Sequence, residues 1–177
     1  MKRAVWAFSA VSALAVLGLL ALQAPDRPLT LVEHQAEGMM RHLATSQITS
    51  VRANTNTGSR TFRRGSDGRW SVRESDKDVA LPEDANAAIE AGLRLLHNTR
   101  PERSFESDSP EFGLATPTLS ILATSADGQT VEATFGASNP IGLSTYVRVN
   151  SKELLGVHLM PSYVANAWSP ALSWSRK

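Results

Sequence analysis

The chain contains no cysteine among its 177 residues, and this absence removes several kinds of chemistry at once. Disulfide bridges, thiolate metal sites and a cysteine nucleophile are all excluded. The chain also lacks an excess of one charge sign, because it has 18 Lys and Arg residues and 17 Asp and Glu residues. A nucleic-acid interface requires a concentrated basic field, so the sequence predicts no nucleic-acid partner.

Recognisable catalytic and metal-binding motifs are missing as well. None of the four histidines lies in a ligand pattern such as H-E-x-x-H, and the serines form neither a G-x-S-x-G elbow nor an S-x-x-K motif. The acidic loop residues Glu106, Asp108 and Glu111 could hold Ca²⁺ weakly, but a solvated loop is the simpler interpretation. The sequence therefore predicts no catalytic residue, no cofactor and no metal ligand.

Charge is absent from residues 4–24, a segment rich in Ala, Val and Leu. A helix of about 20 residues spans the ~30 Å hydrocarbon core of a bilayer. Lys2 and Arg3 precede the segment and favour a cytoplasmic N-terminus. The sequence therefore predicts a single-pass signal-anchor, with everything after residue 24 exported.

A cleaved signal peptide is the alternative, because it has the same basic start and apolar run. Cleavage after Ala24 would place Leu22 where a small residue is preferred and Pro25 just beyond the bond. Because this cleavage site is poor, an uncleaved anchor is favoured, and the cleaved form stays the second possibility.

The rest of the chain is predicted to be an α+β domain at 46–168, with a stalk or short helix at 25–45 before it and a tail at 169–177 after it. Apolar residues at helical spacing predict an amphipathic helix over 82–96. Alternating residues predict strands at 48–51, 61–64, 69–73, 119–124, 130–135, 145–149 and 154–159. This order predicts a mainly antiparallel sheet with one principal helix packed on it. No internal repeat is visible.

Two surfaces are candidates for interaction. The hairpin of 61–64 and 69–73 is expected to point apolar side chains one way and Arg63, Arg69 and Arg73 the other. This basic face suits an anionic partner or lipid headgroups, and a solvated face balanced by nearby acids is the alternative. Aromatic residues near the C-terminus, Tyr163, Trp168 and Trp174, suit a protein or membrane interface. Packing on the sheet is the alternative for Tyr163 and Trp168.

Several short motifs occur in a characteristic order: Gly68-Arg69-Trp70-Ser71-Val72, Glu111-Phe112-Gly113-Leu114, Asp127-Gly128 and Thr145-Tyr146-Val147-Arg148. In this order the chain resembles the domain-of-unknown-function family numbered 4340, over residues 48–168. The resemblance implies a bacterial, membrane-anchored, exported domain, often found near ABC-type transporter or gliding-motility components. It supplies no catalytic residue. Longer relatives hold more than one copy, whereas this chain has room for one.

The resulting hypothesis is a non-enzymatic interaction or assembly module, held in the bacterial inner membrane with its domain in the periplasm. Its partners would be inner-membrane or periplasmic proteins of a transport or envelope complex. The alternative is a glycan- or lipid-binding domain with a groove between sheet and helix. A hydrolase with an unrecognised site is a third possibility, and it would require perturbed carboxylates or a Ser–His contact in a cleft. Trp70 and Phe112 are expected to fill the core beneath the helix.

Overall fold

The structure is a computed structural model that describes residues 38–40, 42–74, 77–152 and 154–175. The predicted anchor at 4–24 and most of the predicted stalk lie outside these residues. Within the described ranges, no helix is long and apolar enough to cross a membrane.

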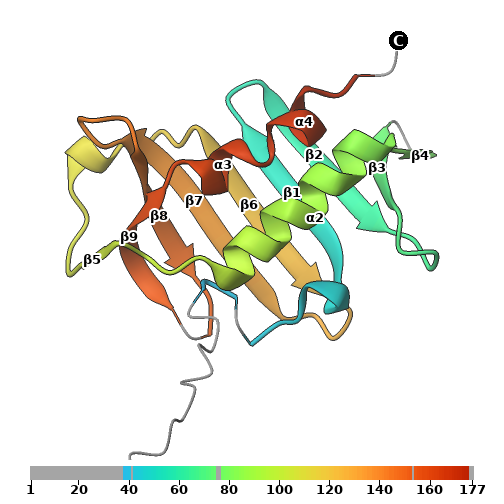
Figure 1. The fold of residues 1–177 in the computed structure, drawn as a ribbon, viewed down its shortest axis with the longest axis horizontal. Coiled ribbons are helices and arrows are strands. Elements are labelled where there is room, and N and C mark those ends of the chain that lie inside the picture. Colours follow the sequence, from blue (N-terminus) through green and yellow to red (C-terminus); the bar gives the residue numbers. More distant parts are fainter. Residues whose placement is uncertain (1–37, 41, 75–76, 153, 176–177) are drawn as a thin grey trace, which may run out of the picture. The chain divides into compact units, whose positions relative to one another are not determined.

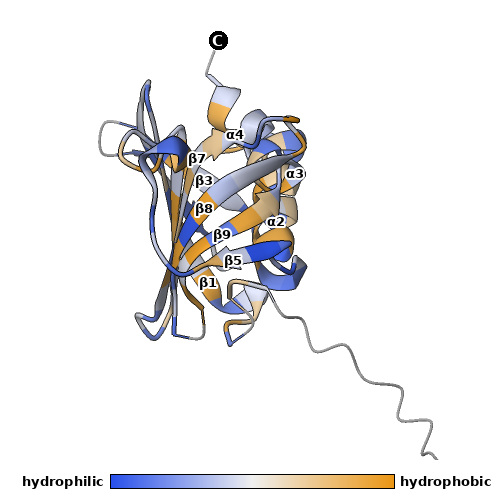
Figure 2. Ribbon diagram, turned by 90° about the vertical axis from the view of Figure 1, so that its left-hand side faces the viewer, coloured by the Kyte–Doolittle hydropathy of each residue, from blue (hydrophilic) through white to orange (hydrophobic). Residues whose placement is uncertain are grey.

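The described residues form a nine-stranded antiparallel sheet with helices on one face (Figures 1 and 2). The strands are β1 (Ile48–Thr55), β2 (Gly58–Arg64), β3 (Trp70–Glu74), β4 (Lys77–Ala80), β5 (Arg103–Phe105), β6 (Leu119–Ser125), β7 (Thr130–Ser138), β8 (Ser144–Asn150) and β9 (Leu155–Pro161). The helices are α2 (Glu83–Asn98), α3 (Tyr163–Asn166) and α4 (Ser169–Ser173), with 3₁₀ turns η1 (Thr45–Gln47) and η2 (Pro110–Phe112). The predicted combination of an antiparallel sheet with a packed helix is therefore confirmed.

The strand order, β4-β3-β2-β1-β6-β7-β8-β9-β5, divides the sheet into two four-stranded meanders. They meet at the centre, where β1 pairs with β6 and Arg52 lies opposite Leu122. A helix follows each meander on the same face: α2 follows β4, and α3 and α4 follow β9. The sequence shows no repeat, yet the two halves have the same order of elements. Helix α2 carries the chain across the face from β4 to the edge strand β5 (Figure 1).

The main core lies between the sheet and α2. The predicted helical stripe is buried: Ala85, Ala88, Ile89, Gly92, Leu93 and Leu96. Gly92 permits an unusually close contact, because a Cβ atom built there would lie 2.5 Å from the indole ring of Trp168. The side chain of Trp168 is fully buried in the same core. Helices α3 and α4 are therefore fixed against α2 rather than extending freely from the sheet.

A second, smaller cluster lies on the opposite face of the sheet. Phe112 and Leu114 pack there against Val157, together with the partly buried Phe105 and Tyr146. Trp70 occupies the main core as predicted, but the placement of Phe112 beneath the helix is wrong. Gly136 explains the difference, because a Cβ at that position would lie 2.1 Å from the carbonyl oxygen of Phe112. Without that Cβ, the η2 segment packs closely on β7.

The domain is larger than predicted at both ends. Met39, Met40 and Leu43 are buried in the main core, although they were assigned to a stalk. The N–H of Met39 donates to the carbonyl of Leu96, and His97 Nδ1 lies 3.1 Å from the carbonyl oxygens of Met40 and Leu43. These contacts join the start of the domain to the end of α2. The supposed tail is also structured, because α4 buries Ala171 in the same core.

Candidate functional site

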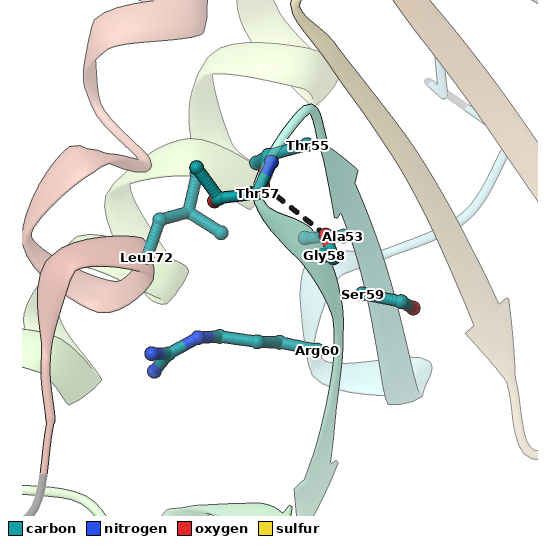
Figure 3. Close-up of a pocket in the computed structure, with 7 residues that line it drawn as sticks. All are labelled: Ala53, Thr55, Thr57, Gly58, Ser59, Arg60 and Leu172. Carbon is teal, nitrogen blue, oxygen red and sulfur yellow. Dashed lines mark hydrogen bonds between the residues drawn. The ribbon is translucent and has the colours of Figure 1, made fainter.

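A pocket of about 290 Å³ lies at the turn of the β1–β2 hairpin, on its helix-facing side (Figure 3). Its lining consists of Ala53, Thr55, Thr57, Gly58, Ser59, Arg60 and Leu172. The register places Arg60 opposite Ala53 and Gly58 opposite Thr55. Leu172 comes from α4, so the pocket exists only because the C-terminal segment folds back over the hairpin.

Arg60 is the one charged residue in this lining. Its guanidinium Nη1 donates a hydrogen bond to the backbone carbonyl of Trp174. Among the described residues, no carboxylate forms an ion pair with Arg60. The Oγ1 atoms of Thr55 and Thr57 lie 2.8 Å apart at the other side of the pocket. The pocket therefore presents a cation and hydroxyl groups without a built-in anion.

A second pocket, of about 480 Å³, lies between the β2–β3 turn and the first turns of α2. Hydrogen bonds donated by β3 to side chains of α2 hold the wall of this pocket in place. The backbone N–H of Trp70 donates to Asn86 Oδ1 at 2.6 Å, and Trp70 Nε1 donates to Glu90 at 2.7 Å. Arg64 pairs with the same oxygen of Glu90 at 2.5 Å and lies over the Trp70 ring. One carboxylate oxygen of Glu90 thus accepts from both Trp70 and Arg64, which indicates a structural role.

Ser104 and His158 form the kind of contact that a hydrolase would require. Ser104 Oγ lies 2.9 Å from His158 Nδ1, across the β5–β9 pairing. Burial lowers the pKa of His158 below its ordinary value of 6.5. Yet His158 Nε2 has no partner among the described residues, so no carboxylate orients the ring, and neither residue lines the two pockets above. The pair lacks the third group that a nucleophilic site uses.

Exposed apolar side chains gather where the β7–β8 turn meets the start of α3. We call Ile141, Leu143 and Tyr163 the apolar end; they are 73%, 70% and 54% exposed. The N–H of Ser162 donates to the carbonyl of Leu143 and ties the two segments together. Asn139 Oδ1 accepts hydrogen bonds from the N–H groups of Leu143 and Ser144, which fixes the turn.

Sequence reasoning missed most of the apolar end. Tyr163 was among the aromatic candidates, and the other signal is the pair of aliphatic residues inside the turn Asn139-Pro140-Ile141-Gly142-Leu143. Another exposed aliphatic residue, Leu155, lies opposite Asn150 at the far end of the β8–β9 pairing. It is 69% exposed and therefore provides a matched comparison for the apolar end.

The structure places the residues of the predicted basic face on β2, on β3 and in the turn between these two strands. Arg63 is exposed on β2, and Arg73 lies 4.0 Å from Asp78 on the neighbouring strand. Arg69 belongs to the turn before β3 and lines the pocket beside α2. Arg63 pairs with Ser71, two residues before Arg73, so Arg63 and Arg73 lie on the exposed face of neighbouring strands.

The aromatic candidates also differ from expectation. Trp168 is not an interaction residue, because its side chain is fully buried against Gly92 of α2. Trp174 is half-buried and packs against the main core, while its carbonyl accepts the hydrogen bond from Arg60. Tyr163, five residues before Trp168, is the exposed aromatic residue of this region.

The acidic loop between β5 and β6 is partly engaged in an ion pair. Asp108 pairs with Arg148 of β8. Within the described ranges, no group of three or more His, Asp or Glu residues lies close enough to hold a metal ion. The loop therefore serves to attach the η2 segment to the sheet.

Comparisons with protein-family models, with curated proteins and with solved structures found no match for this chain. The mostly antiparallel sheet with helices on one face is therefore described from its own coordinates. The functional conclusion accordingly depends on the chemistry of the pocket and of the apolar end.

Proposed function

We propose that the protein is a non-enzymatic, membrane-anchored interaction module that binds a partner protein through its apolar end. Exposure of Ile141, Leu143 and Tyr163 together is the observation that carries this proposal. Leaving large apolar side chains in water costs about 25 cal/mol per Å² relative to burying them. Neighbouring exposed apolar groups of this kind mark interaction surfaces.

The surroundings of the apolar end favour a protein partner. No charged residue occurs in 133–147 or in 159–175, which include both of its segments. The cores of protein interfaces are likewise poor in charge and rich in aromatic residues such as Tyr. The hydrogen bonds that Asn139 Oδ1 accepts hold the turn in place before binding, so little ordering entropy is lost on association.

The proposed location is based on the sequence, and the proposed partner class on the family resemblance. The apolar segment 4–24 would anchor the chain in the bacterial inner membrane, with Lys2 and Arg3 in the cytoplasm and the domain in the periplasm. The resemblance to family 4340 supports inner-membrane or periplasmic partners, including ABC-type transporter components. The protein would then be an accessory subunit of a transport or envelope complex.

Crosslinking of the full chain in its own membrane tests the interaction. The double variant Ile141→Ser/Leu143→Ser should lose the crosslinked partner, because the surface loses its apolar anchors. Leu155→Ser changes an equally exposed leucine at the other end of the pairing and should retain the partner. Equal crosslinking of both variants and of the unaltered protein would contradict the proposal. Replacement of protein crosslinks by lipid crosslinks at the apolar end would indicate a membrane contact instead.

Extraction of the membranes at alkaline pH tests the anchor. An uncleaved anchor keeps the full chain in the membrane pellet, with the N-terminal peptide detectable by mass spectrometry. Release of a shortened chain that begins after residue 24 would support the cleaved signal peptide instead.

A further inference from the structure

We propose that the pocket at the β1–β2 turn is a binding site for a small oxyanion, the phosphate or carboxylate group of a ligand, with Arg60 as its central contact. The site is distinct from the apolar end and does not depend on the proposed protein partner. Three features of the described residues support it: an uncompensated cation, the available hydroxyl group of Thr57 and a local absence of acids.

The first feature is the positive charge of Arg60. Arg60 is half-buried on β2, and its neighbour across the strand pair, Ala53, is fully buried. A guanidinium carries five N–H donors in a planar fork, and the Trp174 carbonyl accepts from one of them. Removing a charge from water is costly unless a counter-charge is supplied. An oxyanion supplies that charge and accepts two parallel hydrogen bonds from the fork.

The hydroxyl groups lie across the pocket from Arg60. Figure 3 shows the Arg60 side chain extending from β2 toward α4, while Thr57 lies beside Leu172. The hydroxyl of Thr55 is engaged with the Gly58 carbonyl at 3.1 Å and with Thr57 at 2.8 Å. The exposed Thr57 hydroxyl can rotate to donate to a ligand. The Ser59 hydroxyl points away in the same view, so it is not part of the contact set.

The local field is positive. The hairpin, residues 48–64, contains four arginines and no Asp or Glu, although Arg52 and Arg63 lie on its exposed face; residues 169–175, which begin with α4, contain no charge. Arg64 is neutralised by Glu90, whereas Arg60 has no such partner among the described residues. The volume of about 290 Å³ fits a small anionic group rather than a lipid chain or an oligosaccharide.

Calorimetric titration tests the site on the full chain in nanodiscs of phosphatidylcholine at low ionic strength. The probes are inorganic phosphate and acetate. Arg60→Gln should weaken binding of the better probe at least about tenfold, because a charge-assisted bidentate contact is lost. Arg63→Gln is the matched control: it removes an exposed arginine of the same strand and should leave the affinity unchanged.

A second variant protects the test from a folding artefact. Thr57→Val alters an exposed turn residue, and it should weaken binding several-fold while leaving the thermal midpoint unchanged.

Nanodiscs that contain phosphatidylglycerol separate the two sources of the anion. If phosphatidylglycerol weakens phosphate binding to the unaltered protein but has no such effect on Arg60→Gln, the natural anion is a lipid headgroup. If phosphate binds equally well with and without this lipid, the natural anion is soluble. Failure of both probes to bind the unaltered protein, or equal affinity in Arg60→Gln and Arg63→Gln, would overturn the proposal.

Discussion

At the scale of single residues, Gly92 shows how one missing side chain determines where the C-terminal segment packs. The position lies in the middle of α2, where glycine is normally unfavourable by about 1 kcal/mol relative to alanine. Here it provides the space occupied by the Trp168 indole. The loss in helix propensity is offset by burial of the largest side chain of the segment.

Gly92→Ala is therefore expected to destabilise the domain, although alanine is the better helix former. The new Cβ would lie 2.5 Å from the indole, so Trp168 or α2 must shift. Such overpacking costs about 1–3 kcal/mol, which exceeds the gain in propensity. Urea unfolding measures the difference. In the double variant with Trp168→Phe the smaller ring should recover part of the loss, and a stabilised Gly92→Ala protein would contradict this account.

His158 gives the stability of the domain a predictable pH dependence. Burial disfavours the charged imidazolium, so the pKa of His158 is lower in the folded chain than the value of 6.5 expected after unfolding. The unfolded chain then binds more protons, and stability is lost as the pH falls from about 6.5 toward the folded pKa. His158→Gln should remove this part of the slope in urea midpoints measured between pH 8 and pH 5.5. An unchanged slope in the variant would show that other groups cause it.

At the scale of elements, two residues one turn apart attach α2 to β3. Asn86 accepts a hydrogen bond from the Trp70 backbone, and Glu90 accepts one from its indole. Asn86 also donates to the carbonyl of Leu81 at 2.7 Å, which fixes the connection from β4 to the helix. The start of α2 is therefore specified by polar contacts, and its middle by the buried stripe.

Asn86→Ala should destabilise the domain by about 1–3 kcal/mol, because the Trp70 N–H and the Leu81 carbonyl both lose their side-chain partner. Hydrogen exchange should accelerate at the Trp70 amide before it does at β1 or β6. Glu90→Gln keeps an acceptor for the indole and loses only the ion pair, so its effect should be smaller. A larger loss in Glu90→Gln than in Asn86→Ala would contradict this ranking.

Local pattern was sufficient to predict the principal elements. Seven strands and α2 appear close to their expected bounds, because alternation and helical spacing are properties of neighbouring residues. The strands β4 and β5 were missed because each is short, rich in charge and paired on one side only. Edge strands of this kind carry little apolar alternation.

The candidate sites were harder to predict because they depend on contacts between distant residues. The pocket forms because Leu172 and Thr55 line the same space and because Arg60 donates a hydrogen bond to the Trp174 carbonyl. The spacing of neighbouring residues in the sequence predicts neither arrangement. The same fold-back buries Trp168, for which the sequence leaves both an interface and packing on the sheet open. Arg60 was overlooked because the expected strand began at residue 61.

At the scale of the whole domain, the two candidate surfaces lie at one end of the sheet. Thr55 at the end of β1 pairs with Leu119, which pairs with Phe135 near the end of β7. The β1–β2 turn and the β7–β8 turn therefore project from the same end, one from each half (Figure 1). Met39 and the start of β1 lie at the other end. An anion in the pocket and a protein on the apolar end could thus be bound at once.

Similar halves raise the question of whether the domain unfolds in one step or two. A single buried cluster includes Val51 and Phe62 of the first half with Ile121 and Phe135 of the second, and α2 covers both. Because the main core spans both halves, and the smaller cluster around Phe112 lies on the other face of the second half, we expect one cooperative transition. In hydrogen exchange, the amides of β1 and β6 should be the slowest and should share one free energy of opening. Protection of β7 and β8 that persists after β2 and β3 have exchanged would show that the halves are independent, and the central pairing would then be an interface between two folding units.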